Sequence, residues 1–294
     1  MSFHAIVQRR WTDLDAQGHA NNTAFAEYFQ EARTQFISAG ATAGMLTSGC
    51  VVVENQVEFA RSIPYSRQPL RVEVVVSELG AAKFVLAMQL YDGTQLAARN
   101  RNTCCPYDFD TRLPRRLTDA ERAHLEANFV SASPFRELPS AQLHGVGERY
   151  EFYPRWSDLD SYGHINNVRF FDFIQEARIA AMTTASGKMA RIGTSSWGEG
   201  ELPTEYVTWL LARQDVKYIA QLGHRLTPYI LVTAPIKIGT SSITYQAEVI
   251  DPEAGNAIMA RAQSVVVAAD QSGTPRALPD DMRAALEARL VTPE

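Results

Sequence analysis

The sequence predicts an α+β protein made of two similar units, each with a long helix followed by a curved antiparallel sheet. Two features support this fold class. Residues 10–33 and 155–178 align at an offset of 145, and 14 of their 24 positions are identical. Each block also runs into a helical pattern and then into several strand-like runs. Each half is long enough to bury its own core, so the repeat indicates two domains.

In the first half, the elements follow a simple order. Residues 5–11 alternate and predict a strand, and residues 12–22 have the Asp, Gly and Asn content of a loop. Asn21 or Asn22 can cap the helix that follows, which should end near Gly40. The apolar face of this helix has helical spacing: Phe25, Tyr28, Phe29, Ala32 and Phe36. Strand-like runs then occupy residues 51–53, 56–60, 70–79, 84–91 and 95–105.

The second half repeats this order. A first strand is expected over residues 149–156, and the helix that follows carries Phe170, Phe173, Ile174, Ala177 and Ala181 at the same spacing. Later strands are expected over residues 215–219, 228–237, 243–251 and 257–269.

A short helix closes each half, over residues 119–129 and 280–290. These two helices align at an offset of 161, so the second half has gained a net 16 residues, most simply within Ser186–Thr204. We expect an N-terminal domain of residues 1–130, a linker of residues 131–147 and a C-terminal domain of residues 148–294.

The composition argues against several classes of partner. The chain is 46% hydrophobic and 21% charged, as in ordinary globular proteins, and its formal charge of −5 offers no basic field for nucleic acid. No apolar run reaches the roughly 20 residues of a membrane span, and the N-terminus lacks a signal-peptide pattern. Cys50, Cys104 and Cys105 form no C-x-x-C pair, which favours small buried thiols and a cytoplasmic location.

Both repeated blocks carry the polar pattern D-x-D-x-x-G-H-x-N-N just before the helix. A helix N-terminus has free N–H groups and a partial positive charge, so it polarises a carbonyl oxygen, as acyl transfer requires. A carboxylate opposite that carbonyl can act as general base or nucleophile. Gly18 and Gly163 would let a ligand approach the backbone. A histidine in this loop could orient the acid, bind substrate or carry a proton.

This block resembles the signature of hot-dog-fold acyl-CoA thioesterases of the 4-hydroxybenzoyl-CoA thioesterase type. It is also similar to fatty acyl-acyl carrier protein thioesterases, in which W-S-D-L-D-x-x-x-H-x-N-N recurs. The resemblance implies a tandem double hot-dog with sites at the interface between two units. It implies that Asp15 and Asp160 are the catalytic carboxylates. It also implies that backbone amides at Asn22 and Asn167 polarise the thioester carbonyl.

The residues that follow the acid separate the two branches of this family. In the acyl carrier protein branch, a histidine four residues after the acid takes part, which corresponds here to His19 and His164. That branch also has an asparagine two residues after the acid, where this chain has Gln17 and Tyr162. This departure favours acyl-CoA as the substrate, with Gln17 and Tyr162 as candidate binding residues.

The expected activity is hydrolysis of an acyl-CoA thioester to a free acid and CoA, without a cofactor or a metal. No H-x-x-x-H spacing occurs among the six histidines, and no G-x-S-x-G, G-x-G-x-x-G or P-loop motif is present. The alternatives are an acyl-acyl carrier protein thioesterase, an enoyl-thioester hydratase of the same fold, and a non-catalytic acyl-thioester-binding protein. Besides acyl-CoA, an acyl carrier protein and further copies of the chain in a homo-oligomer are open as partners.

Other residues of the blocks have a simpler structural interpretation. Asp13 and Asp158, at a tight turn, are expected to bind backbone amides. The Glu-Ala-Arg segments ending at Arg33 and Arg178 lie two to three turns into the helices and are expected to form structural pairs. The tryptophans that open the blocks are expected in the core or in a pocket wall: Trp11 and Trp156.

Overall fold

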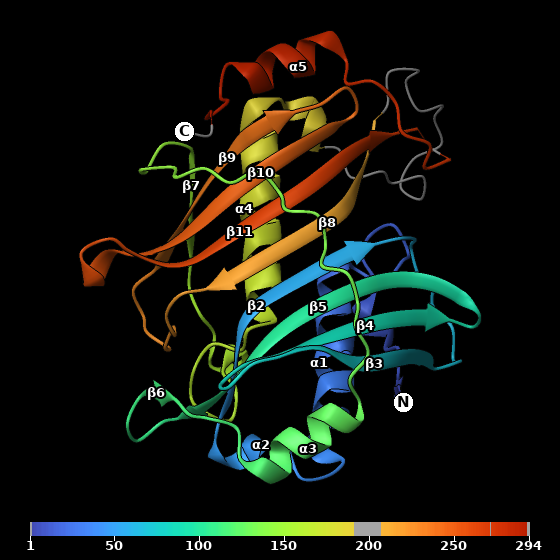
Figure 1. The fold of residues 1–294 in the computed structure, drawn as a ribbon. Helices are drawn as coiled ribbons and strands as arrows, with labels where there is room; N and C mark the ends of the chain where they lie inside the picture. Colours follow the sequence, from blue (N-terminus) through green and yellow to red (C-terminus); the bar gives the residue numbers. More distant parts are fainter. Residues whose placement is uncertain (1, 191–206, 271, 293–294) are drawn as a thin grey trace. The chain divides into compact units, whose positions relative to one another are not determined.

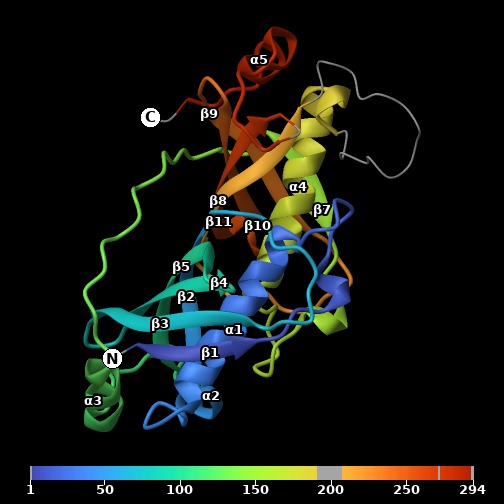
Figure 2. The same ribbon diagram turned by 90° about the vertical axis from the view of Figure 1, so that its right-hand side faces the viewer.

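The computed structural model describes residues 2–190, 207–270 and 272–292. The chain divides into two compact units, Met1–Arg136 and Glu137–Glu294. In each unit, one 17-residue helix lies against a curved antiparallel sheet (Figures 1 and 2). The α+β fold class that the sequence predicts is therefore confirmed.

Unit 1 begins with strand β1 (Phe3–Val7), the short turn η1 (Trp11–Asp13) and the long helix α1 (Asn22–Ser38). After the small helix α2 (Met45–Ser48), five strands follow, and helix α3 (Asp119–Ala127) closes the unit. These strands are β2 (Cys50–Phe59), β3 (Leu70–Leu79), β4 (Phe84–Asp92), β5 (Gln95–Asp108) and β6 (Leu113–Pro114), which pairs with β5. The main sheet has the order β1-β3-β4-β5-β2, and all neighbours are antiparallel.

Unit 2 repeats this arrangement. Strand β7 (Glu148–Phe152), turn η2 (Trp156–Asp158) and helix α4 (Arg169–Ala185) correspond to β1, η1 and α1. Its sheet has the antiparallel order β7-β9-β10-β11-β8, which matches the order in unit 1 strand for strand. The other elements are η3 (Gly187–Ala190), β8 (Thr208–Tyr218), β9 (Tyr229–Ile238), β10 (Ser242–Asp251), η4 (Pro252–Ala254), β11 (Ala257–Ala269) and α5 (Asp280–Glu287).

The long helices form where the apolar spacing predicts them. All five apolar residues predicted for the inner face of α1 are buried, and so are four of the five predicted for α4. In unit 1, α1 packs against β3 and β4, where Val72, Val74 and Leu86 are fully buried. Each helix thus covers one face of its own sheet, and its first turn lies beside the polar loop of the repeat.

Several strand boundaries differ from the prediction. The first strand ends at Val7 rather than at residue 11, because η1 turns the chain from Trp11. Residues 51–53 and 56–59 belong to one strand, β2, which ends one residue before the predicted position 60 and whose register with β5 shifts between Val52 and Glu54. Strand β8 begins at Thr208 rather than at residue 215. Of the segment predicted to hold the insertion, residues 191–204 lie outside the described residues.

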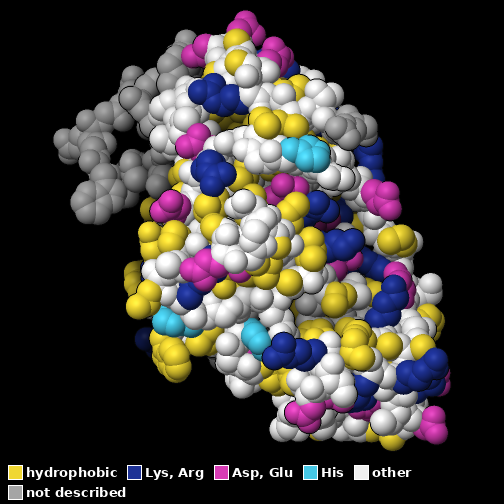
Figure 3. Space-filling view, turned by 90° about the vertical axis from the view of Figure 1, so that its left-hand side faces the viewer, with side chains coloured by type: hydrophobic (Ala, Val, Ile, Leu, Met, Phe, Trp, Pro, Cys, Tyr) yellow, Lys and Arg dark blue, Asp and Glu magenta, His cyan; other side chains and the backbone are white. Residues whose placement is uncertain are grey.

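The tryptophans were expected in the core or in a pocket wall, and the core position is wrong. Trp11 and Trp156 are 71% and 78% exposed, because each begins a 3-10 turn that directs the following aspartate inward. Each ring contacts an aromatic neighbour edge to face: Trp11 lies 5.2 Å from Tyr65, and Trp156 lies 5.7 Å from His224, between ring centroids. Hydrophobic side chains also reach the surface among charged ones on the face drawn in Figure 3.

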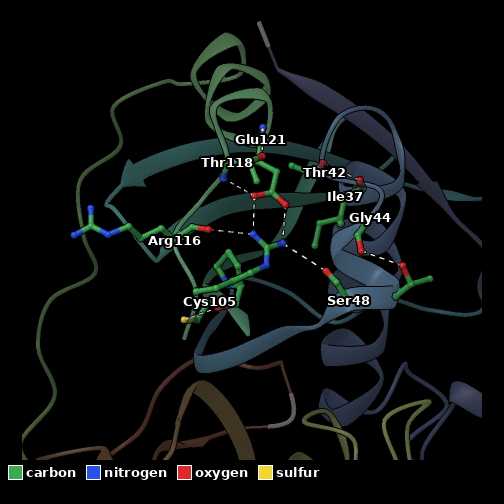
Figure 4. Close-up of polar contacts among 11 residues, drawn as sticks. Ile37, Thr42, Gly44, Ser48, Cys105, Arg116, Thr118 and Glu121 are labelled. Carbon is green, nitrogen blue, oxygen red and sulfur yellow. Dashed lines mark hydrogen bonds and ion pairs between the residues drawn. The ribbon is translucent and has the colours of Figure 1, made fainter. Parts of the chain in front are cut away.

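The N-terminus of helix α3 is held by a capping box and by an ion pair with Arg115. The Thr118 hydroxyl accepts the Glu121 N–H at 3.2 Å, and the Glu121 carboxylate accepts the Thr118 N–H at 2.8 Å, which is a capping box. Arg115 binds both carboxylate oxygens of Glu121, at 2.7 and 2.8 Å, and reaches Ser48 of α2 at 3.5 Å (Figure 4). The hydrogen bonds from Arg115 hold the pKa of Glu121 below its ordinary value.

Candidate active site

The polar loops before α1 and α4 have the same structure. Oδ1 of Asp15 accepts the backbone N–H of Gln17 at 2.8 Å and that of His19 at 3.4 Å. In unit 2, Oδ1 of Asp160 accepts the corresponding amides of Tyr162 and His164 at 2.9 and 3.2 Å. Equivalent distances in the two units differ by no more than 0.2 Å, so the second acid of each block is fixed by its own loop.

The loop backbone closes around the same acid. In unit 1, the Asp15 N–H donates to the His19 carbonyl at 2.8 Å, and the Gly18 N–H donates to the Asp15 carbonyl at 3.0 Å. Unit 2 repeats both bonds at 2.8 and 3.1 Å. Gly18 and Gly163 have φ values of +77° and +79°, a left-handed conformation that favours glycine. The glycine of the motif is therefore required by the turn that holds the acid.

The second oxygen of each acid lies outside these hydrogen bonds. Within the described residues, Oδ2 of Asp15 and Oδ2 of Asp160 accept no hydrogen bond, and both side chains are half-buried. An anchored oxygen fixes the carboxylate plane, while the other oxygen can approach a water molecule or a substrate. The loops thus present one oriented carboxylate oxygen in each unit.

The first acid of each block has a structural role, as expected. Oδ2 of Asp13 accepts the Arg10 N–H at 2.7 Å, and Oδ2 of Asp158 accepts the Arg155 N–H at the same distance. Both aspartates are buried. In unit 1, the Tyr28 hydroxyl also donates to Asp13, and burial together with this bond raises the pKa of Tyr28.

The asparagine pair caps and begins α1 in unit 1, whereas in unit 2 it lies just before α4, which begins at Arg169 after the N-cap Val168. Oδ1 of Asn21 accepts the Thr23 N–H, and Oδ1 of Asn166 accepts the Val168 N–H, both at 3.3 Å. The Asn21 carbonyl accepts the Ala24 N–H at 2.9 Å. Among the first-turn amides of α1, that of Asn22 makes no hydrogen bond to any described residue. This N–H group is available for a carbonyl oxygen at the positive end of the helix.

The other predicted residues, at positions 17, 19, 162 and 164, bind the acids through their backbone N–H groups. Gln17 and Tyr162 each donate their N–H to the acid. The His19 imidazole makes no hydrogen bond to Asp15, and its backbone forms a β-bridge with Pro64. His164 also holds Asp160 through its N–H group. The structure therefore brings both histidines next to the acids, and the contacts are between the acid and the histidine backbone.

Within the described residues, another aspartate outside the motif is held by the same kind of backbone hydrogen bonds. Oδ1 of Asp270 accepts the N–H groups of Ser272 and Thr274 at 2.8 and 3.0 Å, and Gly273 has a φ of +84°. The Gly273 N–H donates to the Asp270 carbonyl at 3.0 Å. The loop alone is thus a common way to hold an aspartate. What distinguishes Asp15 and Asp160 is the helix N-terminus that follows a few residues later.

The arginines of the two Glu-Ala-Arg segments differ, a contrast that the sequence does not reveal. Nη1 of Arg33 donates to Oδ1 of Asn102 on β5 at 3.1 Å, which is the expected structural pair. Arg178 is also buried, but Nη1 of Arg178 has no hydrogen-bond partner in the described part of the chain. The polar residues Gln214 of β8 and Tyr245 of β10 were the available signal that this layer of unit 2 is unusual.

Neither a metal centre nor a membrane span is found in the described part of the chain. Residues 2–190, 207–270 and 272–292 contain no group of three or more His, Cys, Asp or Glu side chains placed to hold a metal ion. Over the same ranges, no helix is long and apolar enough to cross a membrane.

Solved structures with this fold cover almost the whole chain. A candidate oleoyl thioesterase from Lactobacillus plantarum matches with a TM-score of 0.72 and 13% identity, over 92% of this chain and 98% of its own. The 12:0-ACP thioesterase from Umbellularia californica matches with a TM-score of 0.68 and 15% identity, over 91% and 98%. An acyl-ACP thioesterase from Bacteroides thetaiotaomicron has a TM-score of 0.64 and 12% identity, over 90% and 97%. The predicted tandem double hot-dog is confirmed.

The family is established at the level of sequence. No curated protein sequence matches the chain. A family model described as the thioesterase-like superfamily matches twice, over residues 9–139 and 154–286, and both matches contain the polar loop and the helix that follows it. The chain therefore belongs to the thioesterase-like superfamily, with one copy of the family's domain in each half.

Proposed function

We propose that this protein hydrolyses an acyl-CoA thioester, with Asp15 and Asp160 as the reacting carboxylates and a helix N-terminus as the group that polarises the carbonyl. Thioester hydrolysis follows from membership of the superfamily. The choice of CoA, the residue roles and a cytoplasmic location are the parts that we propose. No cofactor is needed for this reaction.

One observation supports the residue roles above all others. In both units, one oxygen of the second acid is held by two loop amides while the other accepts no hydrogen bond from the described residues. A carboxylate held in this way needs no reorganisation before it reacts. The unbonded Asn22 N–H at the start of α1 supplies the complementary donor for a developing oxyanion.

In the proposed reaction, the open oxygen of the acid removes a proton from a water molecule. The water oxygen forms a bond to the acyl carbon, and the carbonyl oxygen becomes negatively charged beside a helix N–H at Asn22 or Asn167. The carbon–sulfur bond then breaks, and the proton passes from the carboxyl group to the departing CoA thiolate. Direct attack by the carboxylate, followed by hydrolysis of the anhydride, is the alternative for the same residues.

Acyl carrier protein is the second candidate carrier of the acyl group. It is supported by the names of two of the full-length structural neighbours, which are acyl-ACP thioesterases. Against it, Gln17 and Tyr162 stand where the carrier-protein branch has asparagine. Hydrolysis rates for one acyl group carried by CoA and by acyl carrier protein distinguish the two.

The test is thiol release from a panel of acyl-CoA substrates, measured for the wild type and for the Asp15→Asn, Asp160→Asn double variant. The amide oxygen of Asn can still accept both loop N–H groups, so folding should be retained while the base is lost. Turnover should fall by a factor of about 100 or more, since general-base catalysis contributes 10²–10⁴. Unchanged turnover would show that these carboxylates are not the reacting groups.

Asp270→Asn is the matched control. It makes the same substitution at an acid that accepts two loop N–H groups in the same way, and also the Ser272 hydroxyl, but outside the repeated motif. We expect full activity from this variant. A loss as large as that of the double variant would mean that the substitution acts through the fold. Water addition to an enoyl-CoA, or tight acyl-CoA binding without turnover, would favour the hydratase or the binding protein.

A further inference from the structure

A buried arginine without an acceptor lies between α4 and the sheet of unit 2. Arg178 is 7% exposed and makes no hydrogen bond or ion pair with the described residues. Burial without a counter-ion lowers the pKa of Arg178 to about 10. A buried charge of this kind is costly unless something accepts its hydrogen bonds.

Two further buried donors lie in the same layer. Gln214 of β8 pairs with Ser264 of β11, and Ser264 pairs with Tyr245 of β10, so the three side chains form a row on one face of the sheet. This face is the one toward α4, because Tyr218, four residues along β8 from Gln214, donates to the Asn167 carbonyl at 2.8 Å. Figure 1 shows α4 behind these strands.

In the described part of the chain, these donors have no acceptor. Nε2 of Gln214 and the hydroxyl of Tyr245 are buried and have no hydrogen-bond partner among the described residues, as is the case for Nη1 of Arg178. Tyr245 and Gln214 are 2% and 1% exposed. The electrostatic interaction between Arg178 and Tyr245 shows that the two groups are close. Three buried donors thus share one layer, where native proteins leave few such groups unpaired.

Unit 1 provides the contrast. The residue equivalent to Ser264 is Asn102, whose side-chain oxygen accepts the hydrogen bond of Arg33. The side chains of this layer are also smaller in unit 2. The cross-strand pair Met88–Asn100 of unit 1 corresponds to the pair Ala247–Ala262 of unit 2. The arginine is satisfied in the first copy of the domain, and in the second it finds no acceptor among the described residues.

We propose that Arg178, Tyr245 and Gln214 form a binding site for a carboxylate attached to an aliphatic chain. The guanidinium of Arg178 binds the carboxylate in a bidentate manner, and the hydroxyl and amide groups donate to the same oxygens. This proposal rests on the proposed function for its substrate class: the carboxylate is either the distal end of the acyl group of a thioester or the free acid that hydrolysis releases.

The charge and the surroundings favour a carboxylate over a phosphate. One carboxylate neutralises one guanidinium, whereas a phosphate dianion would leave a net charge in an apolar layer. The residues one turn from Arg178 are apolar and buried, namely Ile174, Ala181 and Met182. Arg178 lies 11 residues beyond Asn167, about 16 Å along a helix. A chain reaching from the helix N-terminus to this site is therefore that of a medium-length acyl group.

The first experiment measures binding without hydrolysis. Calorimetry compares dodecanoate with methyl dodecanoate, which lacks the charge, on the full chain and on Arg178→Met. In the wild type, dodecanoate should bind about tenfold more tightly or better, since a hydrogen bond to a charged group contributes about 1.5–3 kcal/mol. Arg178→Met should bind both compounds equally. The proposal is overturned if both proteins prefer dodecanoate over methyl dodecanoate to the same extent, or if the wild type has no such preference. Either result indicates that ordered water fills the site.

The second experiment identifies the source of the carboxylate. Hydrolysis of dodecanoyl-CoA is compared with that of the analogue carrying a carboxylate at its distal end. A wild-type preference for the charged substrate that is lost in Arg178→Met assigns the site to the acyl group. Binding of dodecanoate without this preference assigns it to the released acid. A protein that binds dodecanoate through Arg178 but hydrolyses no thioester contradicts only the proposed function.

Arg33→Met is the matched control. It removes the equivalent arginine of unit 1, so it should leave the carboxylate preference unchanged and lower stability, because the side-chain oxygen of Asn102 loses its charged donor and keeps only the Cys104 thiol. Arg178→Met should leave the stability of the free protein unchanged or raise it, because an unpaired buried charge is removed. A large loss of stability in Arg178→Met would show that the arginine supports the fold instead of a ligand.

Discussion

The hydroxyl group of Tyr28 donates a hydrogen bond of 2.7 Å to Oδ2 of Asp13, and Phe173 stands at the equivalent position of unit 2. Asp13 and Asp158 each accept the N–H of the residue three positions earlier at 2.7 Å, and in unit 1 Nε of Arg10 also donates to Oδ1 of Asp13 at 2.9 Å. The hydroxyl is thus an addition to unit 1, made at the base of the loop that carries Asp15.

Tyr28→Phe should therefore lower the free energy of unfolding of unit 1 by about 1.5–3 kcal/mol, the usual contribution of a hydrogen bond to a charged group. Urea unfolding measures this change. Tyr91→Phe is the control, since its hydroxyl bonds Gln89 at the surface and should contribute little. A loss of equal size in both variants would show that the Asp13 contact is not what stabilises this loop.

The same phenol gives a pH dependence. Burial and the bond to Asp13 raise the pKa of Tyr28. A raised pKa means that the unfolded chain ionises first, at a pH of about 10, so the stability from this group is complete below that pH and is lost above it. The difference in stability between the wild type and Tyr28→Phe should therefore shrink above a pH of about 10.

Gly18→Ala and Gly163→Ala should each destabilise the protein by about 1–2 kcal/mol, because an L-residue is strained at positive φ. A methyl group added at either glycine would meet no atom within 4 Å, so strain is the only cost. Gly44→Ala, at a φ of −59° and with equally open space, should be neutral or slightly stabilising. Thermal unfolding of the three variants checks this, and equal shifts would contradict the strain argument.

Glu121→Gln should destabilise unit 1 by about 1–3 kcal/mol at neutral pH, since it weakens both the capping box and the pair with Arg115. The pKa of Glu121 is lowered in the folded protein. Its stabilisation is therefore present above the unfolded value of about 4.3 and is lost as the pH falls below it. The melting temperatures of wild type and variant should converge at low pH. The exposed Glu126→Gln should show almost no effect at any pH.

The single variants Asp15→Asn and Asp160→Asn should each remove about half of the turnover. The reason is that Asp15 and Asp160 accept the same two loop N–H groups, so the two sites should be equally active. The turnover of each variant is measured as thiol release at saturating substrate. One inactive and one fully active variant would assign the reaction to a single unit and contradict the equivalence of the loops.

The sequence predicted what depends on local periodicity and on the repeat. The bounds of α1 and of β3 follow directly from apolar spacing, and the polar loop was recognised because both copies kept it. The exposure of Trp11 depends on a 3-10 turn, and apolar character alone pointed to the core. The different surroundings of Arg33 and Arg178 depend on cross-strand pairs far apart in the chain, which no local pattern reports.

The role of the Asn22 amide can be tested by removing a single N–H group. Asn22 is the first helical residue of α1, where proline is well tolerated, and Asn21 has a ψ of 142°, which suits a residue before proline. Asn22→Pro should therefore fold normally and lose about half of the turnover, as a single acid variant does. Asn22→Ala keeps the amide and should remain fully active. Equal losses in the two variants would assign the effect to the side chain.

Combining Asn22→Pro with each acid variant shows which carboxylate works with this amide. If Asn22 and Asp15 serve the same site, their double variant keeps the activity of the other site, and Asn22→Pro with Asp160→Asn has almost none. If Asn22 instead serves the site of Asp160, Asn22→Pro with Asp160→Asn keeps half of the turnover and Asn22→Pro with Asp15→Asn has almost none. If both double variants keep half of the turnover, the amide has no role in either site, because its removal then adds nothing to the loss of either acid.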